Sequence, residues 1–160
     1  CTGHSGIWTG TMLELTHPEQ DYIRAAGSLG WAFPAALGVK CALPDRPVIC
    51  FTGDGGLWYH IAELETAVRH GINTVTVVNN NHSLNQVGRG YIEEPESDSL
   101  WKFTEVNLAE LARNIGCFGV RVTDPGEIKQ ALEDAFTSDK PAVIDVVSDV
   151  NAMAPRAWTP

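Results

Sequence analysis

Two oxygen-bearing side chains each follow an apolar stretch of the chain, at a spacing that could bring them together. Asp54 lies in Gly53-Asp54-Gly55-Gly56, directly after the apolar run 47–52, and Asn81 follows a second apolar run at 73–78. One carboxylate, one amide oxygen and a nearby backbone carbonyl would form half a shell of hard oxygen ligands. Such a shell suits Mg²⁺, which keeps its remaining positions for phosphate oxygens and water. This pair of residues therefore predicts a metal site that could hold a phosphorylated ligand.

The segments around Asp54 and Asn81 predict a strand–helix–strand unit. Runs 47–52 and 73–78 have the composition of buried strands, and apolar residues recur at helical spacing from Leu57 to Val68. A parallel pair of strands joined by a helix forms a right-handed crossover. A helix of roughly 14 residues descends about 21 Å and a strand of ~7 residues climbs about 23 Å, so the two displacements nearly cancel. Asp54 and Asn81 are therefore expected at the carboxyl edge of the sheet, where open α/β sheets bind ligands.

Gly53-Asp54-Gly55, followed some two dozen residues later by Asn80-Asn81, resembles a known cofactor motif. It is similar to the thiamine-diphosphate motif of enzymes such as acetolactate synthase and benzoylformate decarboxylase. The resemblance implies that Asp54, the Asn81 side chain and the Ser83 carbonyl bind Mg²⁺. It also implies that the backbone N–H groups of Gly55 and Gly56 bind the diphosphate. The alternative is a capped turn followed by an Asn-rich loop.

Two further segments are assigned to the cofactor by the same resemblance. In the segment 25–38, the Gly27 carbonyl would accept a hydrogen bond from the aminopyrimidine, and the Leu29 side chain would hold the cofactor in its bent conformation. The alternative for Leu29 is a core leucine before a helix. At the start of the chain, segment 1–6 is expected to be a loop in which His4 and Ser5 help to hold the diphosphate. The alternative there is a plain polar loop.

The sequence also departs from the pattern of the family in two places. Cys1 stands where members usually have an acidic residue, and Leu84-Asn85-Gln86 replaces a Gly-Met or similar pair. Leu84 is still assigned to the cofactor site by its position after Ser83. Because the second change falls near the reacting carbon, the sequence leaves the substrate open.

Composition narrows the classes of partner. The chain has 160 residues with 44% hydrophobic and 19% charged residues, which fits a single globular domain spanning 1–160. Its formal net charge of −9 argues against nucleic acid or an anionic membrane as a partner. With only 11 Lys and Arg residues, a diphosphate would have to be held by metal and backbone amides. The four cysteines form no CxxC pair, which predicts reduced thiols and a cytoplasmic location.

The rest of the chain alternates predicted helices and strands. Helices are expected over about 33–43, from Asn107 through Ile115, and from Asp124-Pro125 to about Thr137. Strands are expected at 118–122 and 141–147, and an acidic loop at 88–100. This order predicts a doubly wound α/β fold with a mainly parallel sheet and helices on both faces.

The resemblance implies carbon–carbon bond chemistry next to a carbonyl. In this family the thiazolium carbon of the cofactor attacks a 2-oxo acid, and the ring accepts electrons while CO₂ leaves. The reaction needs a glutamate on a separate pyrimidine-binding domain from a partner subunit, so no catalytic residue is expected in this chain, which alone should be inactive. The expected enzyme is an acetolactate-synthase-like carboligase or lyase in a homodimer or homotetramer. The alternatives are a simple 2-oxo acid decarboxylase, a non-catalytic interaction module that retains the fold, and a flavodoxin-type phosphate-binding domain.

Overall fold

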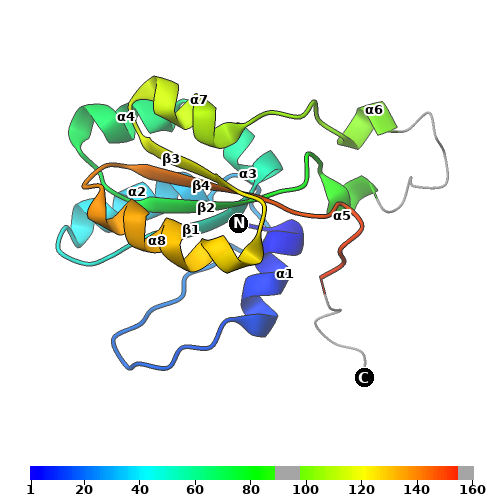
Figure 1. The fold of residues 1–160 in the computed structure, drawn as a ribbon. Helices are drawn as coiled ribbons and strands as arrows, with labels where there is room; N and C mark the ends of the chain where they lie inside the picture. Colours follow the sequence, from blue (N-terminus) through cyan, green and yellow to red (C-terminus); the bar gives the residue numbers. More distant parts are fainter. Residues whose placement is uncertain (89–97, 155–160) are drawn as a thin grey trace.

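A four-stranded parallel sheet forms the centre of the protein (Figure 1). The computed structural model describes residues 1–88 and 98–154. The strands are β1 (Ile49–Gly53), β2 (Val75–Asn80), β3 (Phe118–Val122) and β4 (Ala142–Val147), in the spatial order β1-β2-β4-β3. Every pairing between these strands is parallel, where the sequence predicted a mainly parallel sheet, and Gly53 of β1 lies opposite Asn79 of β2. The carboxyl ends of β1 and β2 therefore meet at one edge of the sheet.

Helices cover both faces of the sheet, which confirms the doubly wound fold. One core cluster joins Cys50, Val78 and Val143 of the strands to α2 (Ala32–Ala42), α3 (Asp54–Trp58), α4 (Glu63–His70) and α7 (Leu108–Ile115). A second cluster joins Ile144 to α8 (Ile128–Thr137). Because successive strand residues point to opposite faces, Val143 and Ile144 mark the two sides.

Short-range sequence signals set several helix ends as predicted. Asn107 caps α7, since its side chain accepts a hydrogen bond from the N–H of Glu110 at 2.9 Å. Gly71 and Gly116 end α4 and α7 with φ of 62° and 109°, the left-handed region that glycine adopts without strain. Before α8, a single 3₁₀ turn (Pro125–Glu127) follows Asp124, whose side chain accepts from the N–H of Gly126.

The helix predicted between β1 and β2 is interrupted, which corrects the sequence-based expectation. It starts at Asp54 as α3, ends at Trp58, and resumes as α4 at Glu63. The intervening turns are tightened, because the N–H groups of His60 and Glu63 bond to carbonyls three residues earlier. The backbone of Gly30 packs against this turn so closely that a Cβ there would lie 2.7 Å from Cβ of Tyr59. The interruption therefore coincides with a close contact from a segment that is distant in sequence.

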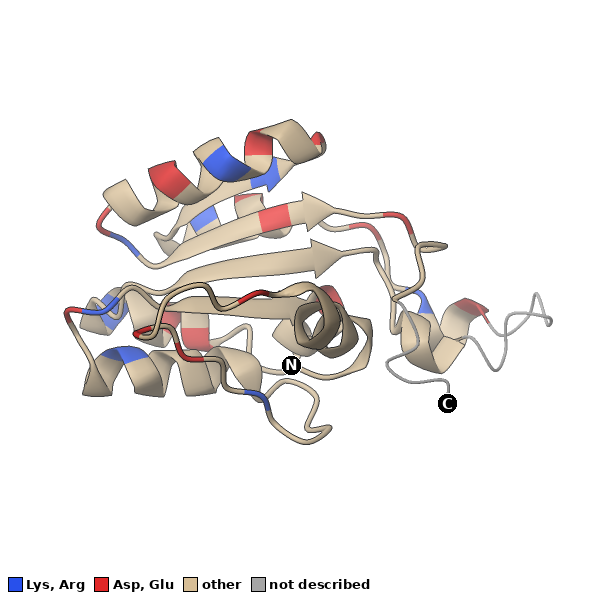
Figure 2. Ribbon diagram, turned by 90° about the horizontal axis from the view of Figure 1, so that it is seen from below, with Lys and Arg blue, Asp and Glu red and all other residues tan. Residues whose placement is uncertain are grey.

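The start of the chain is helical, where the sequence analysis expected a loop over 1–6. Helix α1 (Gly3–Met12) begins without a side-chain cap, and it contains no Lys, Arg, Asp or Glu (Figure 2). Ser5 and Gly6 are buried, and Gly6 packs against the carbonyl of Cys1 and the side chain of Arg24. Tertiary packing thus compensates for a sequence of weak helix formers.

Part of the predicted acidic loop at 88–100 lies outside the described residues. Residues 89–97, which include Glu93, Glu94 and Glu96, belong to that part, as do 155–160 of the tail. On either side of 89–97 the chain is helical and not a loop, in α5 (Asn85–Gly88) and α6 (Asp98–Trp101). Within residues 1–88 and 98–154, no helix has the length and apolar character needed to cross a membrane.

Candidate functional site

A cavity of about 100 Å³ lies at the carboxyl edge of the sheet, beyond the ends of β1 and β2. Nine of the ten residues that the sequence analysis assigned to the cofactor line it; these are His4, Ser5, Leu29, Asp54, Gly55, Gly56, Asn81, Ser83 and Leu84. The remaining lining residues are Cys1, Thr2, Gly3, Gly53, Asn79, Asn85, Gln86 and Val87. Asp54 and Asn81 therefore lie at one site, as the predicted strand–helix–strand unit required.

Ser83, itself one of the three predicted metal ligands, connects the other two. Its backbone N–H donates to Oδ2 of Asp54 at 2.9 Å, and its hydroxyl donates to Oδ1 of Asn81 at 2.8 Å. Asp54 is the first residue of α3 and Asn81 the first residue after β2. Ser83 thus holds the Asp54 carboxylate and the Asn81 amide in fixed relative positions, although these two residues are 27 positions apart in the sequence.

The Asp54 carboxyl group is buried, with a relative exposure of 3%. Burial raises its pKa from the ordinary value of 3.8 to about 6, and the negative charge of Asp145 adds to the rise. Hydrogen bonds from the backbone N–H groups of Gly55 and Ser83 act in the opposite direction. Among the described residues that line the cavity there is no Lys or Arg. The ionised carboxylate therefore lies in a place where a bound cation would be favoured.

Gly55 and Gly56 are closely packed against other side chains of the protein. A Cβ on Gly56 would lie 2.5 Å from Oγ1 of Thr52 and 2.7 Å from Sγ of Cys1. A Cβ on Gly55 would lie 2.5 Å from Cδ2 of Leu84. Both glycines are buried in the first turn of α3, at the wall of the cavity. Their place is consistent with backbone contacts to a diphosphate, which stays a prediction.

His4 and Ser5 reach the cavity from α1 and not from a loop. Both are buried, and Nδ1 of His4 accepts a hydrogen bond from the N–H of Ala154 at 3.3 Å. The Ser5 hydroxyl oxygen lies 3.1 Å from the position of a Cβ on Gly53, so α1 packs directly on the end of β1. Their predicted contact with a diphosphate is compatible with this position and is not tested by it.

Of the two residues that were assigned to the cofactor in segment 25–38, only Leu29 lines the cavity. The half-buried Leu29 lines the cavity, next to Gly30, whose N–H donates to Sγ of Cys1 at 3.3 Å. Gly27 is exposed, has φ of 96° and is absent from the cavity lining. The structure therefore does not bring Gly27 to this cavity, and the role of its carbonyl stays a prediction.

The loop after β2 is held by contacts that the sequence analysis missed. Ser83 pairs with Lys102 in an isolated antiparallel bridge, the N–H of Leu84 donates to the carbonyl of Trp101 at 2.8 Å, and the N–H of Phe103 donates to the carbonyl of His82 at 2.7 Å. No local pattern in the sequence predicts this pairing.

Asn80 and Asp145 were also not among the predicted site residues. Both are buried polar residues on strands, at 1% and 0% exposure, and they are hydrogen bonded to each other. A carboxylate in the apolar run 141–147 was a visible signal, since a buried charge needs a partner.

The donor set fits the predicted metal. Asp54 supplies one buried carboxylate and Asn81 an amide oxygen, and Ser83, whose carbonyl is the third predicted ligand, also lines the cavity. Carboxylate, amide and carbonyl oxygens are the hard ligands that Mg²⁺ binds. Ser83 uses only one of the several acceptor sites on the Asp54 carboxylate. Among the described residues, no group of three or more His, Cys, Asp or Glu side chains is arranged to hold a metal ion.

A larger cavity of about 400 Å³ lies elsewhere, between the ends of α2, α4 and α8. Its lining includes Lys40, His70 and Lys140 and none of the residues of the motif. It lies by the N-terminal part of β2, away from the edge where parallel sheets bind ligands, so the smaller cavity is the better candidate.

Comparison with known proteins identifies the family. Residues 2–146 match the family model described as thiamine pyrophosphate enzyme, C-terminal TPP binding domain. The chain belongs to the thiamine pyrophosphate enzyme family. The matched domain is the one that binds thiamine diphosphate, and the cavity at the carboxyl edge contains the motif by which the sequence resembled this family.

Relatives within the thiamine pyrophosphate enzyme family include acetolactate synthases. The chain is 36% identical over 127 residues to the acetolactate synthase large subunit of Haemophilus influenzae, covering 78% of this chain and 22% of the relative. It is 34% identical over 149 residues to the corresponding subunit of Parasynechococcus marenigrum, covering 90% of this chain and 24% of the relative. The chain thus spans about a quarter of the length of these relatives.

A solved structure of the same family is also similar. It is the thiamine diphosphate-dependent 4-hydroxybenzoylformate decarboxylase of Rhodococcus jostii RHA1, with a TM-score of 0.65 and 28% identity. The match covers 76% of this chain and 23% of that protein. The similarity supports the α/β fold of this family for the chain.

Proposed function

We propose that this chain holds the diphosphate of thiamine diphosphate through Mg²⁺, as part of an acetolactate-synthase-like enzyme that makes or breaks carbon–carbon bonds next to a carbonyl. The observation that carries the proposal is the connection of Asp54 and Asn81 through Ser83 in one cavity. The chain is proposed to be the C-terminal, cofactor-binding part of that enzyme, as a single domain over 1–160.

The residues of the cavity divide into two groups of roles. Asp54, the Asn81 side chain and the Ser83 carbonyl are proposed to bind the metal, while Gly55 and Gly56 offer backbone N–H groups to the diphosphate. The described lining has one carboxylate and neither Lys nor Arg, so a cation is needed to bring a diphosphate next to Asp54. When bound, thiamine diphosphate would supply a thiazolium ring whose carbon, once deprotonated, can add to a carbonyl, and the ring can take up the electron pair of the bond that breaks.

The small size of the cavity supports a second domain. Cavities that enclose small molecules measure about 300–1,000 Å³, whereas this one measures about 100 Å³. We propose that a pyrimidine-binding domain with the catalytic glutamate, from another subunit of a homodimer or homotetramer, closes the site. The chain alone would then be inactive. The substrate is proposed to be a small 2-oxo acid and the location cytoplasmic.

A calorimetric titration tests the cofactor site. Thiamine diphosphate is added to the enzyme assembled with its complementary domain, with Mg²⁺ and with EDTA, and to the Asp54→Ala variant. We expect heat of binding that requires Mg²⁺ and is lost in Asp54→Ala. Asp45→Ala is the control, because Asp45 is an exposed carboxylate between α2 and β1. Equal binding by Asp54→Ala and Asp45→Ala, or no binding by the assembled wild type, would overturn the proposal and favour an interaction module.

A simple 2-oxo acid decarboxylase is the second candidate, because the similar solved structure is named as a decarboxylase. Product analysis separates the two reactions. The assembled enzyme is supplied with pyruvate or an aromatic 2-oxo acid, and the products are separated by chromatography. Release of free aldehyde supports decarboxylation, and an acyloin or acetohydroxy acid supports carboligation.

A further inference from the structure

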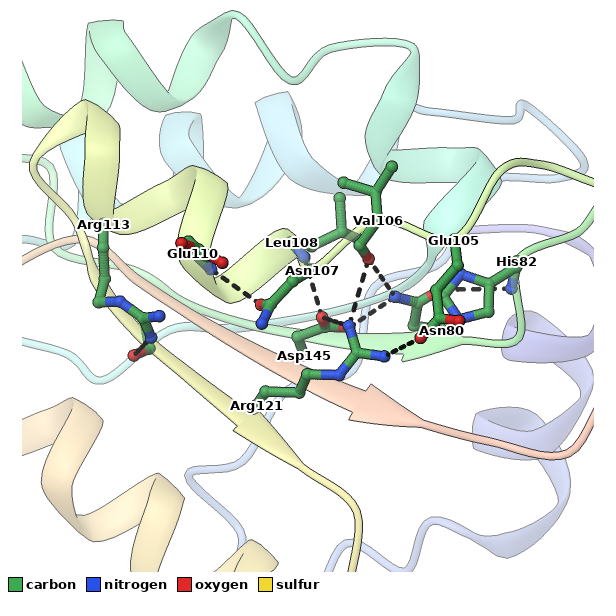
Figure 3. Close-up of polar contacts among 11 residues, drawn as sticks. Asn80, His82, Glu105, Val106, Asn107, Leu108, Glu110, Arg113, Arg121 and Asp145 are labelled. Atoms are coloured by element: carbon green, nitrogen blue, oxygen red, sulfur yellow. Dashed lines mark hydrogen bonds and ion pairs between the residues drawn. The ribbon is translucent and has the colours of Figure 1, made fainter.

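Asn80 and Asp145 connect the core of the sheet to the loop of the proposed metal site (Figure 3). Nδ2 of Asn80 donates to Oδ1 of Asp145 at 2.7 Å, and both side chains are almost completely buried. The strands β2 and β4 are paired, with Val78 opposite Asp145, so Asn80 reaches a carboxylate on its own face of the sheet. The contact spans 65 positions in sequence.

The Asp145 carboxylate decides which way the Asn80 amide points. A carboxylate only accepts hydrogen bonds, so the NH₂ group of Asn80 must face it. The carbonyl of Val106 accepts from the same NH₂ group at 3.4 Å. Oδ1 of Asn80 is thereby directed to the loop, where it accepts from the N–H of His82 at 3.2 Å.

His82 needs such support because its backbone is in the left-handed region, with φ of 55°. This conformation is unfavourable for residues other than glycine. His82 lies between Asn81 and Ser83, so its conformation sets the direction of the Ser83 N–H toward Asp54. A turn at this one residue therefore determines whether the loop faces the first residue of α3.

The Asp145 carboxylate is itself fixed from two other elements. Its Oδ2 accepts from the N–H of Leu108, the first residue of α7, at 2.9 Å. Nη1 of Arg121 on β3 lies 3.4 Å from the same oxygen, and Nη2 of Arg121 contacts Glu105 at 2.9 Å. Donors on β2, β3 and α7 thus converge on a single carboxylate (Figure 3).

We propose that Asp145 and Asn80 are positioning residues for the loop Asn81–Ser83. Asp145 orients the Asn80 amide, and Asn80 holds His82 in the conformation that brings Asn81 and Ser83 to Asp54. What binds at the loop rests on the proposed function. We call the chain of contacts from Asp145 through Asn80 to His82 the relay. It is a property of the protein without cofactor, so it can be measured separately.

Hydrogen exchange of the metal-free protein tests the relay directly. Exchange is followed by mass spectrometry in peptides that span Asn81–Leu84, in the full protein with EDTA. The informative variant is Asp145→Asn, which keeps the size of the side chain and leaves the acceptors of the His82 and Ser83 N–H groups in place. Because the new side chain can donate, the Asn80 amide is free to turn round. Asn80→Ala removes the acceptor of the His82 N–H outright.

Val143→Ala is the control for lost stability, since Val143 is fully buried on β4 and points to the same face as Asp145. We expect exchange in the loop to be at least tenfold faster in Asp145→Asn and Asn80→Ala, after correction for global stability measured by urea unfolding. In Val143→Ala, exchange in the loop should change only as much as the loss of global stability predicts. Loop exchange in Asp145→Asn that only matches Val143→Ala would overturn the relay.

A titration of thiamine diphosphate with Mg²⁺ then measures the consequence for binding in the assembled enzyme. We expect about tenfold weaker binding in Asn80→Ala and in Asp145→Asn, no further loss in the double variant, and less than twofold in Val143→Ala. Unchanged affinity in both single variants would contradict a positioning role. If the wild type itself fails to bind, the proposed function is wrong, while the exchange experiment still decides the relay.

Discussion

The backbone N–H of Ser83 donates to the carboxylate of Asp54, with 2.9 Å between the nitrogen and Oδ2. This hydrogen bond joins the loop after β2 to the first turn of α3. The carboxylate is buried, and burial holds its pKa at about 6. The protein therefore keeps an ionisable group in an environment that disfavours its charge, at the place where we propose that a cation binds.

Asp54→Asn should stabilise the metal-free protein at neutral pH. The folded pKa of Asp54, about 6, lies above its ordinary value of 3.8, so ionisation favours the unfolded chain and stability falls as pH rises between these values. We expect Asp54→Asn to gain about 1–3 kcal/mol at pH 7.5, at roughly 1.4 kcal/mol per pKa unit. The gain should shrink toward pH 4. Urea unfolding with EDTA across this pH range measures it.

The exposed Asp45 provides the control for this effect. Asp45→Asn should leave the free energy of unfolding within about 0.5 kcal/mol of the wild type at every pH. An Asp54→Asn variant that is destabilised at pH 7.5, or a difference that decreases as pH rises, would contradict the assigned environment of Asp54.

Gly56→Ala should destabilise the protein. A Cβ at this position would lie 2.5 Å from Oγ1 of Thr52 and 2.7 Å from Sγ of Cys1, so α3 or its neighbours must move. We expect a loss of about 1–3 kcal/mol, as for other overpacked sites. Gly38→Ala is the matched change, since Gly38 lies in α2 with nothing within 4 Å of its Cβ position. That variant should gain about 0.5–1 kcal/mol. Thermal unfolding measures the stability of both variants. Equal changes in stability would contradict the close packing at Gly56.

Leu29→Ala should weaken binding of the cofactor without unfolding the protein. Leu29 is half-buried and lines the cavity, and truncation removes apolar contact worth about 1.5 kcal/mol, or roughly tenfold in affinity. The exposed Leu43 follows α2, and Leu43→Ala should change affinity less than twofold. Calorimetric titration of thiamine diphosphate with Mg²⁺ into the assembled enzyme measures both. A large loss of stability with unchanged affinity would make Leu29 a plain core residue.

Two carboxylates that contact Arg121 should differ greatly in importance. Asp145 is fully buried, whereas the side chain of Glu105 is 73% exposed. Removing the buried partner leaves donors of β2, β3 and α7 without an acceptor, so Asp145→Ala should cost about 3–5 kcal/mol. Glu105→Ala removes a solvated ion pair and should cost less than about 1 kcal/mol. Urea unfolding of the two variants gives the comparison. Similar losses would show that the pair with Arg121, and not burial, determines the energy.

Features that depend on short-range geometry could be predicted from the sequence. Gly71, Asn107 and Gly116 set helix ends as expected, because capping and the left-handed conformation involve only neighbouring residues. The convergence of Asp54 and Asn81 was also predictable, because a parallel crossover returns the chain to the same edge of the sheet.

Features that depend on residues distant in sequence could not be predicted from local patterns. The turn between α3 and α4 packs against Gly30, and α1 forms where buried contacts offset weak helix propensity. The contact of Asn80 with Asp145 joins strands that are adjacent in the sheet but 65 positions apart in sequence. Hydrogen bonds and packing act over a few ångströms in space whatever the separation along the chain. Local patterns could therefore predict residues that line the candidate site, but not the residues that hold them in place.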